Sequence, residues 1–166
     1  MRIVVTGSEC TGKSTLARTI AAELGWALVP EESRRYAESI GRALTREDVE
    51  PIARATIAAI DAAPTHAILD TDLISTIVYA RHYYGACPPW IVDAALDRRA
   101  TLYLLCHTDV PWVADGVRDR PEARSRLHLD FAVTLEAVNA HVVDIIGDWE
   151  TRDATARAAV RAARAG

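Results

Sequence analysis

The residues whose types and spacing most clearly predict chemistry lie at positions 7–14. They read Gly-Ser-Glu-Cys-Thr-Gly-Lys-Ser and match the phosphate-loop pattern G-x-x-x-x-G-K-[ST]. Glycines in such a loop let successive backbone N–H groups curl around phosphate oxygens, and the dipole of the helix that follows adds to this cradle. Lys13 is expected to reach the β and γ phosphates, and Ser14 to ligate Mg²⁺. The pattern therefore predicts a site for ATP and Mg²⁺.

Composition points to the same loop. Of the 19 Lys and Arg residues, 18 are Arg and the one lysine is Lys13. If arginine supplies positive charge everywhere else, this exception marks a position that needs a compact ammonium on a flexible stem. We expect the ATP contacts to come from the loop and from one tryptophan that can stack on the base: Gly7, Glu9, Cys10, Thr11, Gly12, Lys13, Ser14, Thr15 and Trp149.

Acidic residues that directly follow predicted strands are candidates for metal and acceptor contacts. Ligands of an open parallel sheet gather beyond the carboxyl ends of its strands. Asp70 ends one apolar run and is expected to hold Mg²⁺ beside Ser14. Glu31 follows another run and is expected to act as general base on an acceptor hydroxyl. Asp72 is either a helix cap or a contact to the acceptor, and the sequence leaves both open.

Arginines are expected close to the transferred phosphate, because phosphoryl transfer spreads negative charge over the moving group. The stretch 110–125 combines prolines, a glycine and scattered charges, which predicts a mobile loop. Arg118 and Arg120 are expected to form its lid and to touch phosphate, with Arg124 and Arg126 beside them. The alternative is a solvated basic face.

Three further side chains are candidates for acceptor contacts. Arg34 and Tyr36 follow Glu31 closely and are expected to orient the acceptor. Trp90 is expected to stack on an acceptor ring, although aromatic residues are more often simply packed.

Length and charge limit the class of protein. The 166 residues suit one domain, 1–166, which is large enough to bury its own core. A net charge of −4 lacks the basic character that nucleic acid or an anionic membrane requires, so neither is expected as a partner. The three cysteines are not closely paired and no run approaches membrane-spanning length, which favours a reducing, cytoplasmic location.

The elements that must position these residues follow from hydrophobic patterning. Continuous apolar runs predict strands at 2–6, 26–29, 67–70, 101–106 and 141–146, and such runs are typical of a parallel sheet buried on both faces. The predicted helices span 13–24, 45–63, 72–84, 88–98, 126–139 and 151–164. Thr45 and Asp48 resemble a capping box, and Pro51 is a residue that can kink the helix after it. The predicted fold class is α/β.

The motifs also occur together in a known family. The chain resembles the ribosylnicotinamide (nicotinamide riboside) kinase domain of NadR-type NAD-biosynthesis proteins over nearly its whole length. The segments that carry the resemblance are 7–9, 12–16, 29–31 with Arg34 and Tyr36, 41–45, 70–74, 111–115 and 118–120. The resemblance implies a P-loop kinase fold, with a five-stranded parallel sheet in the order 2-3-1-4-5, helices on both faces and an arginine-bearing lid.

The same resemblance implies an activity. ATP would transfer its γ-phosphate to the ribose 5′-hydroxyl of nicotinamide riboside, a small nucleoside, giving nicotinamide mononucleotide in NAD salvage. Two alternatives stay open: a kinase for another nucleoside or small alcohol, and a nucleotide-switched binding module. A GTPase switch is disfavoured because the motif Asn-Lys-x-Asp cannot form when Asn139 is the only asparagine and Lys13 the only lysine.

Overall fold

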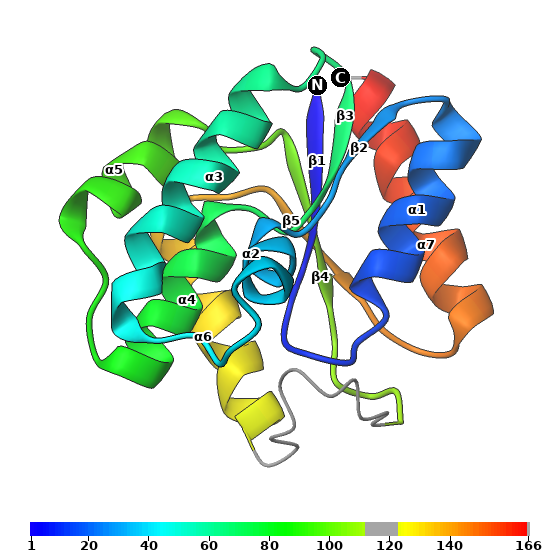
Figure 1. Ribbon diagram of the computed structural model, residues 1–166. Helices are drawn as coiled ribbons and strands as arrows, with labels where there is room; N and C mark the ends of the chain where they lie inside the picture. The colour runs from blue at the N-terminus through cyan, green and yellow to red at the C-terminus, as the bar shows by residue number, and fades with distance from the viewer. Residues whose placement is uncertain (112–122, 166) are drawn as a thin grey trace.

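The computed structural model describes residues 1–111 and 123–165 (Figure 1). Five parallel strands form one sheet in the order β2-β3-β1-β4-β5. Their bounds are β1 Arg2–Thr6, β2 Ala27–Val29, β3 Ala67–Asp70, β4 Leu102–Cys106 and β5 Val142–Ile145. The central strand β1 places Val5 opposite Asp70 of β3 and Leu104 of β4. The parallel sheet and its expected strand order are confirmed.

Helices cover both faces of the sheet (Figure 1). On one face lie α1 (Lys13–Leu24) and α7 (Trp149–Ala165). On the other lie α3 (Val49–Ala62), α4 (Leu73–Tyr84), α5 (Pro89–Asp97) and α6 (Arg124–Ala137). The short helix α2 (Glu32–Ile40) and the 3₁₀ turn η1 (Arg46–Asp48) pack beside α3.

The core consists of two apolar layers that share the sheet. Ile3 and Val5 belong to the layer under α1 and α7, whereas Val4 belongs to the layer under α3 to α6. All three side chains are fully buried. Because successive residues of a strand point to opposite faces, a strand covered on both sides must be apolar throughout. This explains why continuous apolar runs identified the strands.

Two details differ from the sequence-based expectations. Helix α2 was not predicted, because it contains no buried residue and so lacks the apolar stripe that indicates a helix. Helix α3 begins at Val49, directly after the capping box that Thr45 and Asp48 form. Pro51 lies in its first turn, where backbone N–H groups have no helical partner, so no kink is required.

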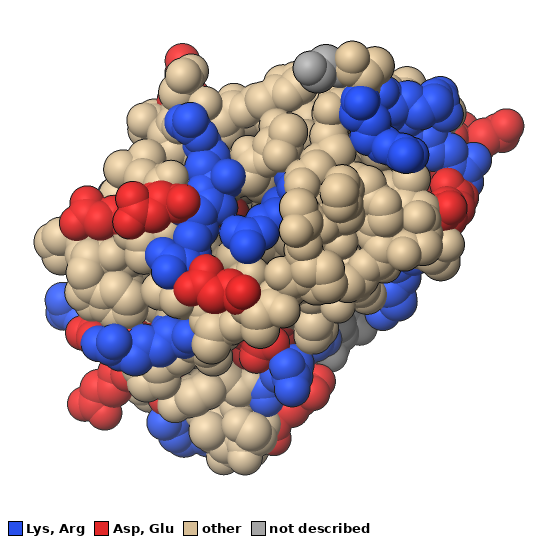
Figure 2. Space-filling view, turned by 90° about the horizontal axis from the view of Figure 1, so that it is seen from above, with Lys and Arg blue, Asp and Glu red and all other residues tan. Residues whose placement is uncertain are grey.

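The face over the amino ends of the strands carries both signs of charge. Figure 2 shows arginine side chains there interleaved with acidic ones. Arg98 and Asp61, for example, form two hydrogen bonds of 2.9 and 2.8 Å. Across 1–111 and 123–165, no helix combines the length and apolar character needed to span a bilayer.

Candidate active site

The phosphate loop connects β1 to α1 at the edge of the sheet where the strands end (Figure 1). Gly7 and Gly12 have φ angles of 132° and 81°, values that L side chains rarely adopt. A Cβ atom at Gly7 would lie 2.6 Å from the carbonyl oxygen of Cys106, and one at Gly12 would lie 2.5 Å from the ring of Trp149. The loop therefore needs both glycines, and the ring of Trp149 packs directly against it.

Lys13 is held inside this loop. It is 9% exposed, and its Nζ donates a 2.6 Å hydrogen bond to the carbonyl of Ser8. The hydroxyl of Thr11 donates to the same carbonyl at 2.9 Å. An ammonium at the start of a helix, surrounded by loop backbone, fits the phosphates of a nucleotide.

Asp70 ends β3 and lies beside Ser14. Burial raises the pKa of Asp70, while a hydrogen bond from the Ser14 hydroxyl and the charge of Lys13 oppose this rise. The Oδ1 atom of Asp70 is buried and has no hydrogen-bond partner among the described residues. A carboxylate and a hydroxyl beside a phosphate loop fit Mg²⁺, which takes its remaining ligands from water and phosphate. The described ranges hold no cluster of three His, Cys, Asp or Glu side chains that would suit a metal by itself.

Glu31 ends the segment after β2 and directly precedes α2. Its side chain is only 8% exposed, and its Oε1 accepts a 2.7 Å hydrogen bond from the Ser33 hydroxyl. Its Oε2 lies 3.7 Å from Nε of Arg34. The charge of Glu31 also contributes to the raised pKa of Asp70, so the two carboxylates are close. The structure thus brings the predicted base and the predicted metal ligand together.

A cavity of about 760 Å³ adjoins these carboxylates, and this volume is sufficient for a nucleoside. Its walls come from α2, the loop that follows it, α3 and α4. Ser33, which donates to Glu31, and Thr71, which follows Asp70, both line it. The cavity is therefore the candidate acceptor site.

Asp72 lines this cavity and also caps α4. It accepts a 2.9 Å hydrogen bond from the backbone N–H of Ile74 and another of 2.9 Å from the Tyr103 hydroxyl. Burial raises the pKa of Asp72 to about 6, against these two hydrogen bonds, which lower it. Of the two roles that the sequence left open, the helix cap is present, and acceptor contact stays a prediction.

Sequence reasoning did not assign the aromatic wall of the cavity. Tyr79 and Tyr83 lie one turn apart on α4 with parallel rings, at a centroid distance of 6.1 Å and an angle of 5°. Both line the cavity together with Tyr84, whose hydroxyl donates to the carbonyl of Leu44 at 3.1 Å. The signal that could have found them is the spacing of four between Tyr79 and Tyr83, which places them on one helix face.

Asp48 organises the opposite wall of the cavity. It is 3% exposed and accepts hydrogen bonds of 2.7 and 2.9 Å from Arg42, a cavity residue, and one of 3.2 Å from the hydroxyl of Tyr36. The hydrogen bonds from Arg42 hold the pKa of Asp48 well below its usual range. Tyr36 thus supports the wall from behind, and it is not among the residues that line the cavity.

Trp90 lies apart from the cavity. It belongs to α5, and the guanidinium of Arg54 lies 4.7 Å from the centre of its ring. Trp90 is not among the lining residues of the cavity, so the structure does not bring it to the acceptor site. Its surroundings agree better with the alternative, that Trp90 is simply packed against its neighbours.

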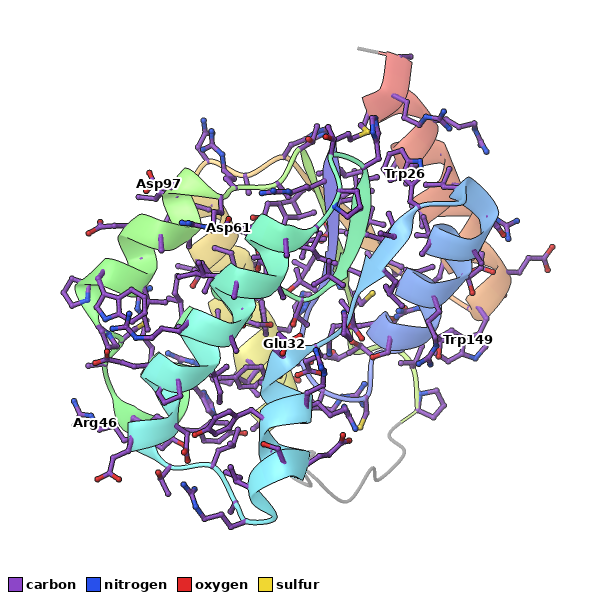
Figure 3. The ribbon with its side chains drawn as sticks, turned by 45° about the horizontal axis from the view of Figure 1, so that its top comes forward. Trp26, Glu32, Arg46, Asp61, Asp97 and Trp149 are labelled. Atoms are coloured by element: carbon purple, nitrogen blue, oxygen red, sulfur yellow. The ribbon has the colours of Figure 1, made fainter. Side chains whose placement is uncertain are left out.

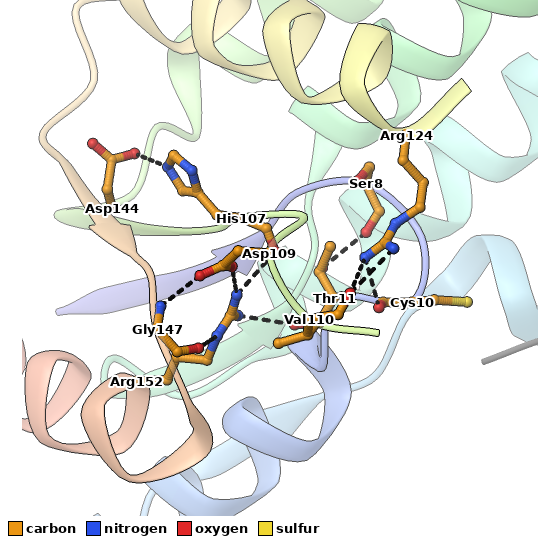
Figure 4. A network of polar contacts seen from close by, with 10 residues as sticks. All are labelled: Ser8, Cys10, Thr11, His107, Asp109, Val110, Arg124, Asp144, Gly147 and Arg152. Carbon is orange, nitrogen blue, oxygen red and sulfur yellow. Dashed lines mark hydrogen bonds and ion pairs between the residues drawn. The ribbon is translucent and has the colours of Figure 1, made fainter. Parts of the chain in front are cut away.

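Arg152 of α7 ties the phosphate loop to neighbouring segments (Figure 4). It is 2% exposed and lies 5.7 Å from the ring of Trp149, which Figure 3 shows beside the start of α1. Its guanidinium donates to the carboxylate of Asp109 and to the carbonyl oxygens of Thr11, His107 and Gly147. The sequence offered no signal for this role, because the contact with Thr11 joins residues 141 positions apart.

A second arginine reaches the loop from α6. Arg124 is 8% exposed and donates to the carbonyl oxygen of Cys10 at 3.2 Å and to that of Val110 at 3.2 and 3.3 Å (Figure 4). Its guanidinium therefore supports the loop backbone.

The other arginines expected in the lid have different positions. Arg126 is exposed and pairs with Asp130 one turn further along α6, at 3.1 Å. Arg118 and Arg120, the predicted phosphate contacts, lie outside the described residues, as does the rest of the expected lid between 112 and 122.

Comparisons with known proteins identify the family. The model of the AAA domain family matches residues 2–152. The trifunctional NAD biosynthesis/regulator proteins NadR of Salmonella typhimurium and of Escherichia coli are each 32% identical over 124 residues, which is 70% of this chain and 30% of theirs. The chain therefore spans less than a third of the length of these relatives.

Solved structures show the same relationship. A crystal structure of NadR in complex with NR has a TM-score of 0.85 at 26% identity, over 97% of this chain and 50% of that one. Another, with NAD and AMP-PNP, has a TM-score of 0.83 at 25% identity, over 99% and 49%. Thymidylate kinase from Ehrlichia chaffeensis shares the fold, with a TM-score of 0.72 at 16% identity over 97% and 98%. The chain belongs to the AAA domain family of P-loop proteins and resembles NadR in both sequence and fold.

Proposed function

We propose that this chain is an ATP-dependent kinase that phosphorylates the ribose 5′-hydroxyl of nicotinamide riboside, giving nicotinamide mononucleotide and ADP. The observation that carries the proposal is the position of Glu31, between Asp70 at the phosphate loop and Ser33 on the cavity wall. Related NadR proteins were crystallised with NR, the acceptor of this reaction, and with AMP-PNP, an analogue of its donor.

The residues at this edge have distinct roles in the proposed reaction. Bound Mg-ATP supplies the phosphoryl group and the positive charge of the metal. Lys13 and the loop N–H groups stabilise the negative charge of the transferred group, and Ser14 and Asp70 hold Mg²⁺. Glu31 accepts the proton of the acceptor hydroxyl as its oxygen bonds to phosphorus and ADP departs. The hydrogen bond from Ser33 keeps Glu31 oriented.

The lining of the cavity favours a cationic acceptor. Nicotinamide riboside carries a positively charged pyridinium ring, and aromatic faces and carboxylates attract such a cation. Tyr79, Tyr83 and Asp72 supply these groups. A neutral nucleoside gains less from them, so the charge of the acceptor ring contributes to selectivity.

An acceptor screen tests the proposal. The chain is incubated with Mg-ATP and, in turn, nicotinamide riboside, adenosine, uridine, the 2′-deoxy forms of these ribosides, and thymidine. ADP release is followed, and the product is identified by mass spectrometry. We expect nicotinamide riboside among the best acceptors. Lys13→Ala serves as the inactive control and should lower turnover at least about 100-fold, because it removes phosphate stabilisation.

The possible results separate the alternatives. If nicotinamide riboside is inert while another nucleoside reacts, the proposed acceptor is wrong but the proposed kinase activity is supported. If ATP is hydrolysed rapidly without any acceptor, a nucleotide-switched module is the better description.

A further inference from the structure

The side chain of Glu9 is buried although it belongs to the phosphate loop. It is 5% exposed. Its Oε1 accepts a hydrogen bond from the Tyr83 hydroxyl at 3.4 Å, which is long for a bond between oxygens. Its Oε2 is buried and has no hydrogen-bond partner among the described residues. The carboxylate of Glu9 is thus poorly satisfied by the groups around it.

Phosphate is an unsuitable partner for this carboxylate, because both groups are anionic and only accept hydrogen bonds at neutral pH. The carboxylate whose charge raises the pKa of Asp70, the predicted metal ligand, is that of Glu31. A buried carboxylate needs donors, since leaving it without them costs stability. The donors that the Glu9 carboxylate needs can still come from the side on which Tyr83 lies.

Glu9 is not itself among the residues that line the acceptor cavity, and the contact that links it to the cavity is the one with Tyr83. The ring of Tyr83 lines the cavity and lies parallel to that of Tyr79. The Tyr83 hydroxyl nevertheless reaches back to Glu9. A ligand in the cavity that displaces this long hydrogen bond meets a carboxylate able to accept two hydrogen bonds. Vicinal hydroxyl groups are donors of that kind.

We propose that Glu9 is a specificity-determining residue whose carboxylate accepts hydrogen bonds from the 2′- and 3′-hydroxyls of the acceptor ribose. The inference rests on the proposed kinase function and adds the recognition of the sugar. It assigns Glu9 to the acceptor rather than to ATP, while the backbone of the loop still serves the nucleotide. Ribosides are then preferred over deoxyribosides.

The test compares each acceptor riboside with its 2′-deoxy and 3′-deoxy forms. A hydrogen bond to a charged group discriminates by about 10- to 100-fold, so wild-type kcat/KM should fall by this factor for each deoxy form. Glu9→Gln should lower kcat/KM for the riboside by a similar factor and leave the deoxy forms within about threefold, so the preference disappears. The KM for Mg-ATP should stay within about threefold.

Two further variants complete the experiment. Glu23→Gln makes the same change on the surface of α1, where Glu23 pairs with Arg157, and should keep the full preference for ribosides. Tyr83→Phe removes the hydroxyl that donates to Glu9 and keeps the ring on the cavity wall, so the ratio of riboside to deoxyriboside kcat/KM should be kept or rise, whatever the variant's absolute rate. This variant tests the inference even when Glu9→Gln does not fold.

Several outcomes contradict the inference. The assignment is overturned if Glu9→Gln discriminates as strongly as wild type, or if it loses all acceptors equally while its KM for Mg-ATP rises. A ratio of riboside to deoxyriboside kcat/KM that falls tenfold in Tyr83→Phe also overturns it. A wild-type chain that phosphorylates no nucleoside refutes the proposed function itself, and this inference with it.

Discussion

Three carboxylates at the carboxyl ends of β2 and β3 are buried to a similar extent but have different partners. Glu31, Asp70 and Asp72 are 8%, 7% and 6% exposed. Asp72 is satisfied by Ile74 and Tyr103, and Asp70 faces Ser14. Of the three, Glu31 lies between Asp70 and Ser33 of the cavity wall, and in the proposed reaction this position makes it the proton acceptor.

Glu31→Gln should therefore impair the chemical step. The amide keeps the size of the side chain but cannot accept the acceptor proton, so kcat should fall by about 100-fold or more. The KM for ATP should change by less than about threefold, because Glu31 does not belong to the loop. Steady-state kinetics check this, with Glu32→Gln as control, since Glu32 bonds to Arg35 instead. An unchanged rate in Glu31→Gln would transfer the role of base to Asp72.

The buried Asp72 should make stability depend on pH. Its pKa is raised from 3.8 to about 6, so the folded chain binds the proton more tightly than the unfolded chain does. The stability that the folded chain gains from protonated Asp72 is fully present below pH 3.8 and is lost as the pH rises through about 6. At 1.36 kcal/mol per pKa unit, the difference amounts to about 3 kcal/mol.

Urea unfolding at a series of pH values tests this with Asp72→Asn. Asparagine keeps an oxygen for the cap of α4 and cannot ionise. The difference in the free energy of unfolding, wild type minus variant, should decrease as the pH is raised from about 4 to about 7. All other titrating groups are common to both chains, so a constant difference across this range would contradict the assigned burial.

Among the elements, α7 determines the shape of the phosphate loop as much as α1 does. Arg152 joins the loop to the ends of β4 and β5, and the ring of Trp149 occupies the space that a side chain at position 12 would need. The helix that follows the last strand therefore helps to hold the phosphate loop in place.

Arg152→Met should loosen this arrangement. The substitution removes the donor that Asp109 and three carbonyl groups share. Losing a hydrogen bond from a charged donor costs about 1.5–3 kcal/mol, and less at Asp109, whose side chain is 35% exposed. Thermal unfolding should move to lower temperature, and the KM for ATP should rise about tenfold. Arg161→Met, on the exposed side of the same helix, is the matched control and should change neither. A lower melting temperature with an unchanged KM would limit Arg152 to a structural role.

The sequence predicted most elements because their burial leaves a pattern. Each strand is mostly apolar, with Asp144 the polar exception inside β5, and the observed bounds differ from the predicted ones by at most one residue. Helix α2 leaves no such pattern, since none of its residues is buried. Its position is set by packing beside α3 and by the contact of Tyr36 with Asp48, which a local reading of the sequence does not reveal.

At the scale of the whole molecule, the two apolar layers share one sheet, so neither can unfold alone. Phe131 of α6 is fully buried under one face, whereas Leu129 on the same helix is 59% exposed. Phe131→Ala should lower the free energy of unfolding by about 3–5 kcal/mol, and Leu129→Ala by less than about 0.5 kcal/mol. Urea unfolding followed by fluorescence and circular dichroism should give one coincident transition. Separate transitions would show that the layers unfold independently.

Some features of the site could be predicted from the sequence, and others depend on how the whole chain packs. The loop and its flanking carboxylates were predicted because a motif fixes their spacing along the chain and a parallel sheet collects its strand ends. The cavity was not, because Tyr79, Tyr83 and Arg42 meet only after α2, α3 and α4 have packed. The spacing of Tyr79 and Tyr83 indicates a shared helix face, but it does not indicate that this face lines a cavity, and nothing local marks Arg42 as part of its wall.

The only lysine of the chain, Lys13, lies with its nitrogen against the Ser8 carbonyl inside the phosphate loop. Any acylating reagent or acetylating enzyme that attacks lysine amines in this sequence is consequently directed to the nucleotide site. Such a modification turns an ammonium into a neutral amide and removes the charge that phosphate needs. The arginines elsewhere do not compete for amine chemistry, and the other amine, at Met1, is distinguished from Lys13 by peptide mapping. Acylation of Lys13 should therefore decrease when a nucleotide occupies the loop.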